Sequence, residues 1–124
     1  MTDYAAQIAD LKLYKELEGS AGRDGTTDAD VTQLVAMVNE AAAVAGPLLE
    51  LIPQTFKQYT SHNLGHCRNL IDLMGRFIPR ETLGRMNGLE LAVLLLSALL
   101  HDFGMFVTDR EKTEALKRDV LSSP

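Results

Sequence analysis

The chain has 124 residues, about the length of one domain, and its net charge is −5. Hydrophobic residues make up 46% of it and charged residues 23%, a balance that favours a folded globular protein over a disordered chain. No apolar run reaches the length of about 18 residues that indicates a membrane span, so we expect no span and no membrane partner. No signal peptide is visible. The single cysteine, Cys67, excludes an internal disulfide and suits a reducing cytoplasm.

The N-terminal part of the chain predicts two helices joined by a glycine-containing loop. Residues 2–18 carry apolar side chains at steps of three and four residues, which is typical of an amphipathic helix. A loop over residues 19–25 follows, and a second helix begins near residues 27–28, where a capping side chain is present. We expect this helix to run to about residue 45, because Gly46-Pro47 interrupts it or starts a new segment.

The C-terminal part predicts further helices and no strands. A helix begins near residues 60–61 and is ended by Pro79, and a short piece leads to another helix over residues 88–101. The latter is apolar on nearly every side, so we expect it to be central and fully buried. A final amphipathic segment covers residues 108–121. Because no segment alternates convincingly with a period of two residues, the predicted fold is all-α, a bundle of about five helices.

Basic residues concentrate in the middle of this acidic chain. Residues 1–56 contain three basic and nine acidic residues, whereas residues 57–85 contain five basic and two acidic residues. A local basic region can steer an anionic ligand, although the same pattern also fits an ordinary solvated face.

Three histidines and one aspartate are the candidates for metal chemistry. His62 and His66 are four residues apart, so on a helix they share one face and can reach the same ion. The pair His101-Asp102 ends the helix that is expected to be buried, where an ionisable pair is costly unless its charge is compensated. A divalent cation would compensate it, and imidazole with carboxylate suits zinc, iron, manganese or magnesium. The alternative is that the histidines are structural, with His101 near the carbonyls of a helix end.

Two segments carry these residues: YTSHNLGHCRNL over 59–70 and LLHDFGM over 99–105. They resemble the HD-domain superfamily of metal-dependent phosphohydrolases, over roughly half of the chain. The resemblance implies a divalent metal ion (Mn, Fe, Zn or Mg) held by His66, His101 and Asp102. It also implies hydrolysis of a phosphate mono- or diester by a metal-activated water, with Asp102 taking part in catalysis by bridging a second ion in a two-metal site.

The other expected site residues are basic. Lys57, Arg68 and His62 are candidates for binding phosphate oxygens, since positive donors stabilise charge that develops there. His62 is also expected on the substrate side of the catalytic site. Solubility is the alternative role for Lys57 and Arg68.

One part of the family pattern has no clear counterpart. The last aspartate ligand of the family lies on a helix well downstream, and neither Asp109 nor Asp119 matches that position. We therefore expect an N-terminal helical segment over residues 1–50 and an HD-like domain over residues 51–124 that is truncated at its C-terminus. Catalysis then depends on a longer chain that supplies the missing ligand.

Several functions are consistent with these features. The first is a phosphohydrolase domain acting on a phosphorylated small molecule or nucleotide in the cytoplasm. The second is a degenerate HD-like helical module that binds a nucleotide or a partner protein without turnover, and the third is a plain helical interaction domain. Nucleic acid is not favoured, because aromatic residues make up only 6% and tryptophan is absent. A truncated bundle leaves an apolar face uncovered, which favours a homo-oligomer or a larger multidomain assembly.

Overall fold

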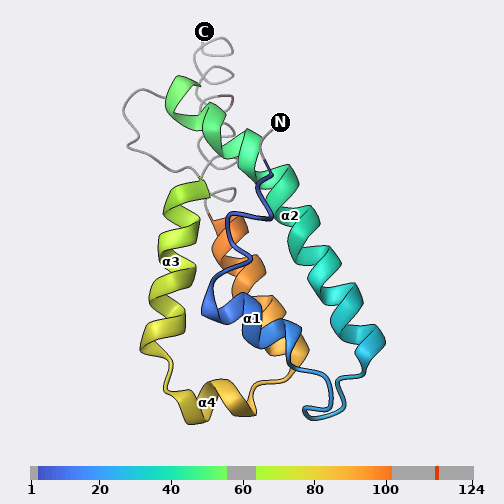
Figure 1. Ribbon diagram of the computed structural model, residues 1–124. Coiled ribbons are helices and arrows are strands. Elements are labelled where there is room, and N and C mark those ends of the chain that lie inside the picture. Colours follow the sequence, from blue (N-terminus) through green and yellow to red (C-terminus); the bar gives the residue numbers. More distant parts are fainter. Residues whose placement is uncertain (1–2, 56–63, 102–113, 115–124) are drawn as a thin grey trace, which may run out of the picture.

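The computed structural model describes residues 3–55, 64–101 and 114, and its regular elements within these ranges are all helices (Figure 1). The prediction of an all-α fold is confirmed. The elements in chain order are α1 (Lys12–Glu18), α2 (Asp28–Thr55), α3 (Leu64–Phe77), α4 (Arg80–Arg85) and the helix Gly88–His101. Helix α1 contacts both α2 and α3, and these two also contact each other, so α1 closes one side of the bundle.

One hydrophobic core joins the described helices. It includes side chains from the N-terminal turns, from α1, from one face of α2 and α3, from α4 and from the helix Gly88–His101. Its fully buried larger members are Ile8, Leu13, Leu17, Val38, Leu49, Cys67, Ile71, Leu83, Leu91, Leu95 and Leu99. Cys67 is completely buried and serves as a small core residue. Because residues on both sides of position 50 contribute, the N-terminal segment and the later helices share this core.

The first helix is shorter than the periodicity predicted. Residues 4–10 form turns, and regular helix begins only at Lys12. Leu11 precedes it in an extended conformation, with φ −78° and ψ 150°. Both Ile8 and Leu11 are nevertheless buried, so the apolar spacing reports core contacts made by a turning chain rather than by a continuous helix.

Helix α2 continues through Gly46-Pro47, so the expected interruption is wrong. A proline inside a helix costs about 3 kcal/mol, since it removes one hydrogen bond and crowds the preceding turn. Here Ala45 and Leu49 are completely buried on either side of it, and their burial favours an unbroken helix. The predicted boundary between residues 50 and 51 lies inside this helix.

The helix Gly88–His101 is only half buried, and the prediction that it is fully buried is wrong. Leu91, Leu95 and Leu99 lie in the core, whereas Leu89 and Val93 are 62% and 51% exposed. The described helices cover one side of it, so this largely apolar helix presents its second side to solvent.

Helix α2 contains a stretch that the expectation of no membrane span did not account for. Its part from Asp28 to Glu50 is long and apolar enough, by length and composition, to cross a membrane, and 22% of its most apolar window is buried. A single helix of this kind is weak evidence for a span, because the core helix of a soluble protein meets the same criterion. Val38 and Ala42 of this helix lie in the core.

Candidate metal centre

The structure brings together two of the three predicted metal ligands. His66 lies in the first turn of α3, and His101 is the last described residue of the helix Gly88–His101. Their ring centroids are 5.6 Å apart, and the ring planes are inclined by 46°. Both side chains are exposed at this end of the bundle.

The packing of each helix fixes these two positions. Leu64, Cys67 and Ile71 anchor the first turns of α3 in the core, and His66 precedes Cys67 by about 100° around the helix. Ala98 and Leu99 are buried and anchor the last turn of the other helix. The histidine pair therefore forms where two core-packed helices meet.

One hydrogen bond sets the tautomer of His101. Its Nδ1 lies 2.7 Å from the carbonyl oxygen of Ala98, so Nδ1–H donates and the lone pair is carried by Nε2. Histidines that ligate metals commonly donate their other N–H to a backbone carbonyl in this way. The same bond also satisfies a histidine at a helix end, so it fits both the metal-binding and the structural role.

The separation of the rings is compatible with one shared ion. An imidazole centroid lies about 3.2 Å from an ion bound at the usual Zn–N distance, so two rings on one ion have centroids about 4.5–6 Å apart. The value of 5.6 Å falls within this interval. Among the residues that the structure describes, however, no group of three or more His, Cys, Asp or Glu side chains is placed to hold an ion.

The remaining candidates lie outside the described residues. These are the expected ligand Asp102, the substrate-side residues Lys57 and His62, and the downstream aspartates Asp109 and Asp119. Their roles stay predictions.

Arg68 has a structural contact that the sequence did not predict. Its guanidinium forms a bidentate pair with Asp10, with Nη1–Oδ1 and Nη2–Oδ2 distances of 2.7 and 3.1 Å, and Nη1 also donates to the Gln7 carbonyl at 2.5 Å. The hydrogen bond from Arg68 lowers the pKa of Asp10, and the carboxylate in turn raises the pKa of Arg68. In the described fold Arg68 therefore ties α3 to the N-terminal turns, and contact with a phosphate would have to compete with Asp10.

A second ionic cluster lies around Glu16 of α1, which is only 8% exposed. Arg23 donates to it at 2.8 Å and also to the carbonyl oxygen of Leu83 at 3.1 Å, while Arg80 of α4 binds the other carboxylate oxygen. The hydrogen bond from Arg23 is the main reason that the pKa of Glu16 is lowered. No local spacing could have revealed this cluster, because Glu16 and Arg80 are far apart in the sequence.

Comparison with known proteins identifies the class of the domain. The HD-CE family model matches residues 56–123, which is more than half of the chain. The chain therefore belongs to the HD-CE family, an HD-related domain, and the resemblance read from the histidine segments is confirmed. HD-type domains generally bind divalent metal ions. No curated protein and no solved structure matches the chain.

Proposed function

We propose that this chain is the metal-binding part of an HD-type phosphohydrolase. The observation that supports it most directly is the approach of His66 and His101, which come from separate helices and lie 5.6 Å apart between ring centroids. Family membership over residues 56–123 supports the same conclusion, since both histidines lie inside the matched range.

In this proposal His66, His101 and Asp102 hold a divalent metal ion: manganese, iron, zinc or magnesium. Such an ion, when bound, would supply a water of lowered pKa and Lewis acidity toward a phosphate ester. His101 contributes Nε2, because the Ala98 carbonyl holds the proton on Nδ1. This preset tautomer removes one step of reorganisation when the ion binds.

The expected substrate is a phosphorylated small molecule or nucleotide in the cytoplasm. Lys57 and His62 are proposed to bind its phosphate oxygens. Arg68 would contact the phosphate only after its ion pair with Asp10 is broken. Turnover is proposed to need a further aspartate ligand, supplied by a longer form of the chain.

Metal analysis tests the ligand assignment directly. Protein purified without chelator is examined by plasma mass spectrometry as wild type and as His101→Ala and Asp102→Ala. We expect about one or two ions per wild-type chain and loss of metal in both variants. Asn69→Ala, an exposed change on α3, is the control and should keep full occupancy. Full occupancy in His101→Ala would show that the ligand assignment is wrong.

Activity is tested separately on p-nitrophenyl phosphate and bis(p-nitrophenyl) phosphate, with added manganese. His62→Ala should lower substrate affinity or rate while leaving metal content unchanged. An inactive protein with full metal occupancy would favour a module that binds a nucleotide without turnover.

That second function is a module that binds a nucleotide without turnover. It is supported by the family match, which identifies an HD-related domain without identifying an activity. Titration with a fluorescent nucleotide, followed by analysis for released phosphate, separates the two functions.

A further inference from the structure

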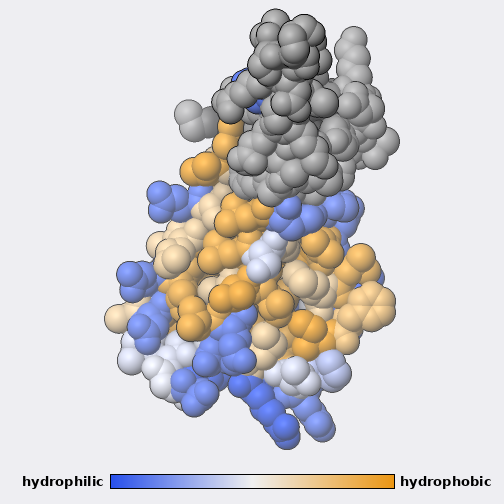
Figure 2. All heavy atoms as spheres, turned by 180° about the vertical axis from the view of Figure 1, so that it is seen from behind, coloured by the Kyte–Doolittle hydropathy of each residue, from blue (hydrophilic) through white to orange (hydrophobic). Residues whose placement is uncertain are grey.

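Two parallel stripes of apolar residues lie exposed on one face of the bundle. On α2 the stripe contains the exposed Met37, Val44 and Leu48 and the half-buried Ala41. On the helix Gly88–His101 it contains the exposed Leu89, Val93 and Leu100 and the half-buried Leu96. Both stripes have the same steps of four, three and four residues, which is the spacing of a coiled-coil seam. Figure 2 shows the broad hydrophobic band on the face opposite to the view of Figure 1.

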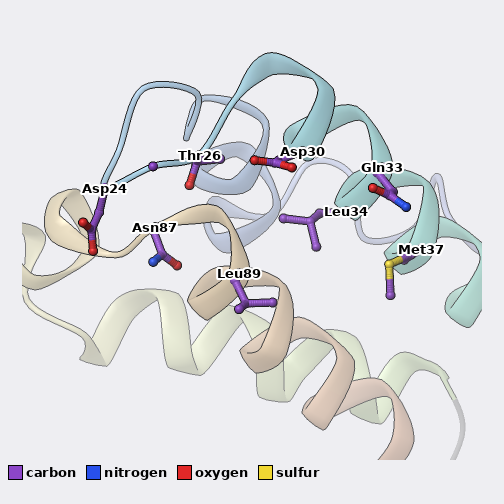
Figure 3. Close-up of a pocket in the computed structure, with 9 residues that line it drawn as sticks. Asp24, Thr26, Asp30, Gln33, Leu34, Met37, Asn87 and Leu89 are labelled. Carbon is purple, nitrogen blue, oxygen red and sulfur yellow. The ribbon is translucent and has the colours of Figure 1, made fainter.

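Two neighbouring hollows lie between the stripes, and together we call them the α2 groove. One is a pocket of 480 Å³ lined by Leu34 and Met37 of α2 and by Leu89 (Figure 3). The second, of 350 Å³, is lined by Val44 of α2 and by Leu100. Met37 lines both, so the two hollows lie next to each other along α2.

The two helices that form the groove start side by side. The backbone N–H of Gly88 donates to Thr26 Oγ1 at 3.0 Å, just before α2 begins. Each helix is then capped reciprocally, Thr27 with Asp30 and Asn87 with Glu90. The N-terminal ends of the two helices are held by these hydrogen bonds, and their inner faces are buried in the core. The two sides of the groove are therefore fixed relative to each other before any ligand binds.

The charge around the groove has one sign. Both helices contain acidic residues but no lysine or arginine between residues 28 and 55 or between residues 88 and 101. Asp24 and Asp30 line the pocket at one end, and Glu40 lines the second hollow. A complementary ligand is therefore apolar along its centre and basic at its margins.

The exposed area fits a single helix better than a second copy of the chain. Six side chains of the stripes are 42–62% exposed, which leaves about 500 Å² of apolar surface. A stable dimer needs about 800 Å² from each partner, whereas a helix in a groove is held by a few anchors at the spacing seen here. A second copy would also bring acidic margins against acidic margins.

We propose that the α2 groove binds an amphipathic helix of a partner protein, with an apolar stripe flanked by lysine or arginine. Its apolar side chains seat between the two stripes, and its basic residues pair with Asp24, Asp30 and Glu40. The groove from Asp30 to Leu48 is about 27 Å long at the helical rise, which matches a partner helix of about 18 residues. The proposal does not depend on metal binding or hydrolysis.

Two synthetic helical peptides of equal length test the proposal. Both carry leucine at alternating steps of three and four residues, and the flanking positions are lysine and arginine in one peptide and glutamate in the other. Fluorescence anisotropy with the full chain measures their affinities. We expect the basic peptide to bind at least about tenfold more tightly than the acidic one, with an advantage that shrinks as salt is raised.

Variants locate the binding surface. Val44→Gln with Val93→Gln should weaken the basic peptide about tenfold or more, and Glu40→Lys should reduce the difference between the peptides. Phe77→Gln is the matched control, because Phe77 is a 79% exposed apolar residue of α3 that does not line the groove. Circular dichroism checks that each variant keeps its helix content.

Three results would overturn the proposal. One is equal binding of both peptides, or no binding of either, by folded protein. Another is a concentration-dependent dimer in sedimentation analysis that Val93→Gln abolishes, which would make a second copy the occupant. The third is binding to phosphatidylcholine vesicles that depends on the same residues while neither peptide binds, which would make the groove a membrane contact.

Discussion

Replacement of Gly46 by alanine should destabilise the protein, although Gly→Ala inside a helix normally stabilises it. Gly46 lies within α2, where alanine is favoured over glycine by about 1 kcal/mol. A Cβ atom added at this position would overlap the ring of Tyr4, whose Cγ, Cδ1 and Cε1 atoms all lie against the glycine. The ring would have to leave its place against the core.

The size of the effect follows from these two opposing contributions. Overpacking of a well-packed site costs about 1–3 kcal/mol, and the helix preference returns about 1 kcal/mol of that. We therefore expect Gly46→Ala to lower the free energy of unfolding by up to about 2 kcal/mol. Gly84→Ala in α4 is the matched control, because a Cβ there meets nothing within 4 Å, and it should stabilise by up to about 1 kcal/mol.

Urea unfolding followed by circular dichroism measures both variants. The penalty at Gly46 should disappear in a Tyr4→Ala background, since the double-mutant cycle removes the overlapping ring. If Gly46→Ala and Gly84→Ala stabilise the protein equally, the packing of the N-terminal turns against α2 is not as described.

Three further predictions concern charge and metal. Arg23 holds the pKa of Glu16 below its ordinary value. The pair therefore contributes stability that is fully present above about pH 4.3 and is lost as the pH falls through the folded-state pKa. In urea titrations at several pH values, Glu16→Gln should make stability depend less on acid pH. Asp10→Asn and Arg68→Gln should each lower stability slightly at low salt, and the loss should shrink in 1 M NaCl (about 3 Å Debye length), because this pair is exposed. Manganese added after chelator treatment should raise the thermal midpoint, with about 2.7 kcal/mol of stabilisation when the ion is at 100 times its Kd, and the increase should be absent in His101→Ala.

The features that could be predicted from the sequence are those with a local pattern. The stripe of Cys67 and Ile71 predicted α3, and Pro79 marked its end, as the structure shows. The segments around His66 and His101 were enough to identify the family that the comparison confirms. These patterns are local because helical periodicity and motif spacing are properties of neighbouring residues.

The features that were missed depend on contacts between distant residues. Gly46-Pro47 looks like a break until the burial of Ala45 and Leu49 and the ring of Tyr4 are known. The helix Gly88–His101 looks fully buried because apolar composition does not tell how many helices surround it. For the same reason Arg68 looked like a phosphate ligand, since its partner Asp10 lies in the opposite part of the chain.

The N-terminal turns contact parts of the protein that are made much later. Asp10 can pair with Arg68 only after 58 further residues have been synthesised, and Glu16 can pair with Arg80 only after 64. At about 5–20 residues per second, a ribosome needs roughly 3–13 s to synthesise that interval. During this time Leu13 and Leu17 have no α3 or α4 to cover them. The nascent chain is therefore expected to be a target for chaperones until α4 has emerged, and a ribosome-stalled chain ending before residue 80 should bind them longest.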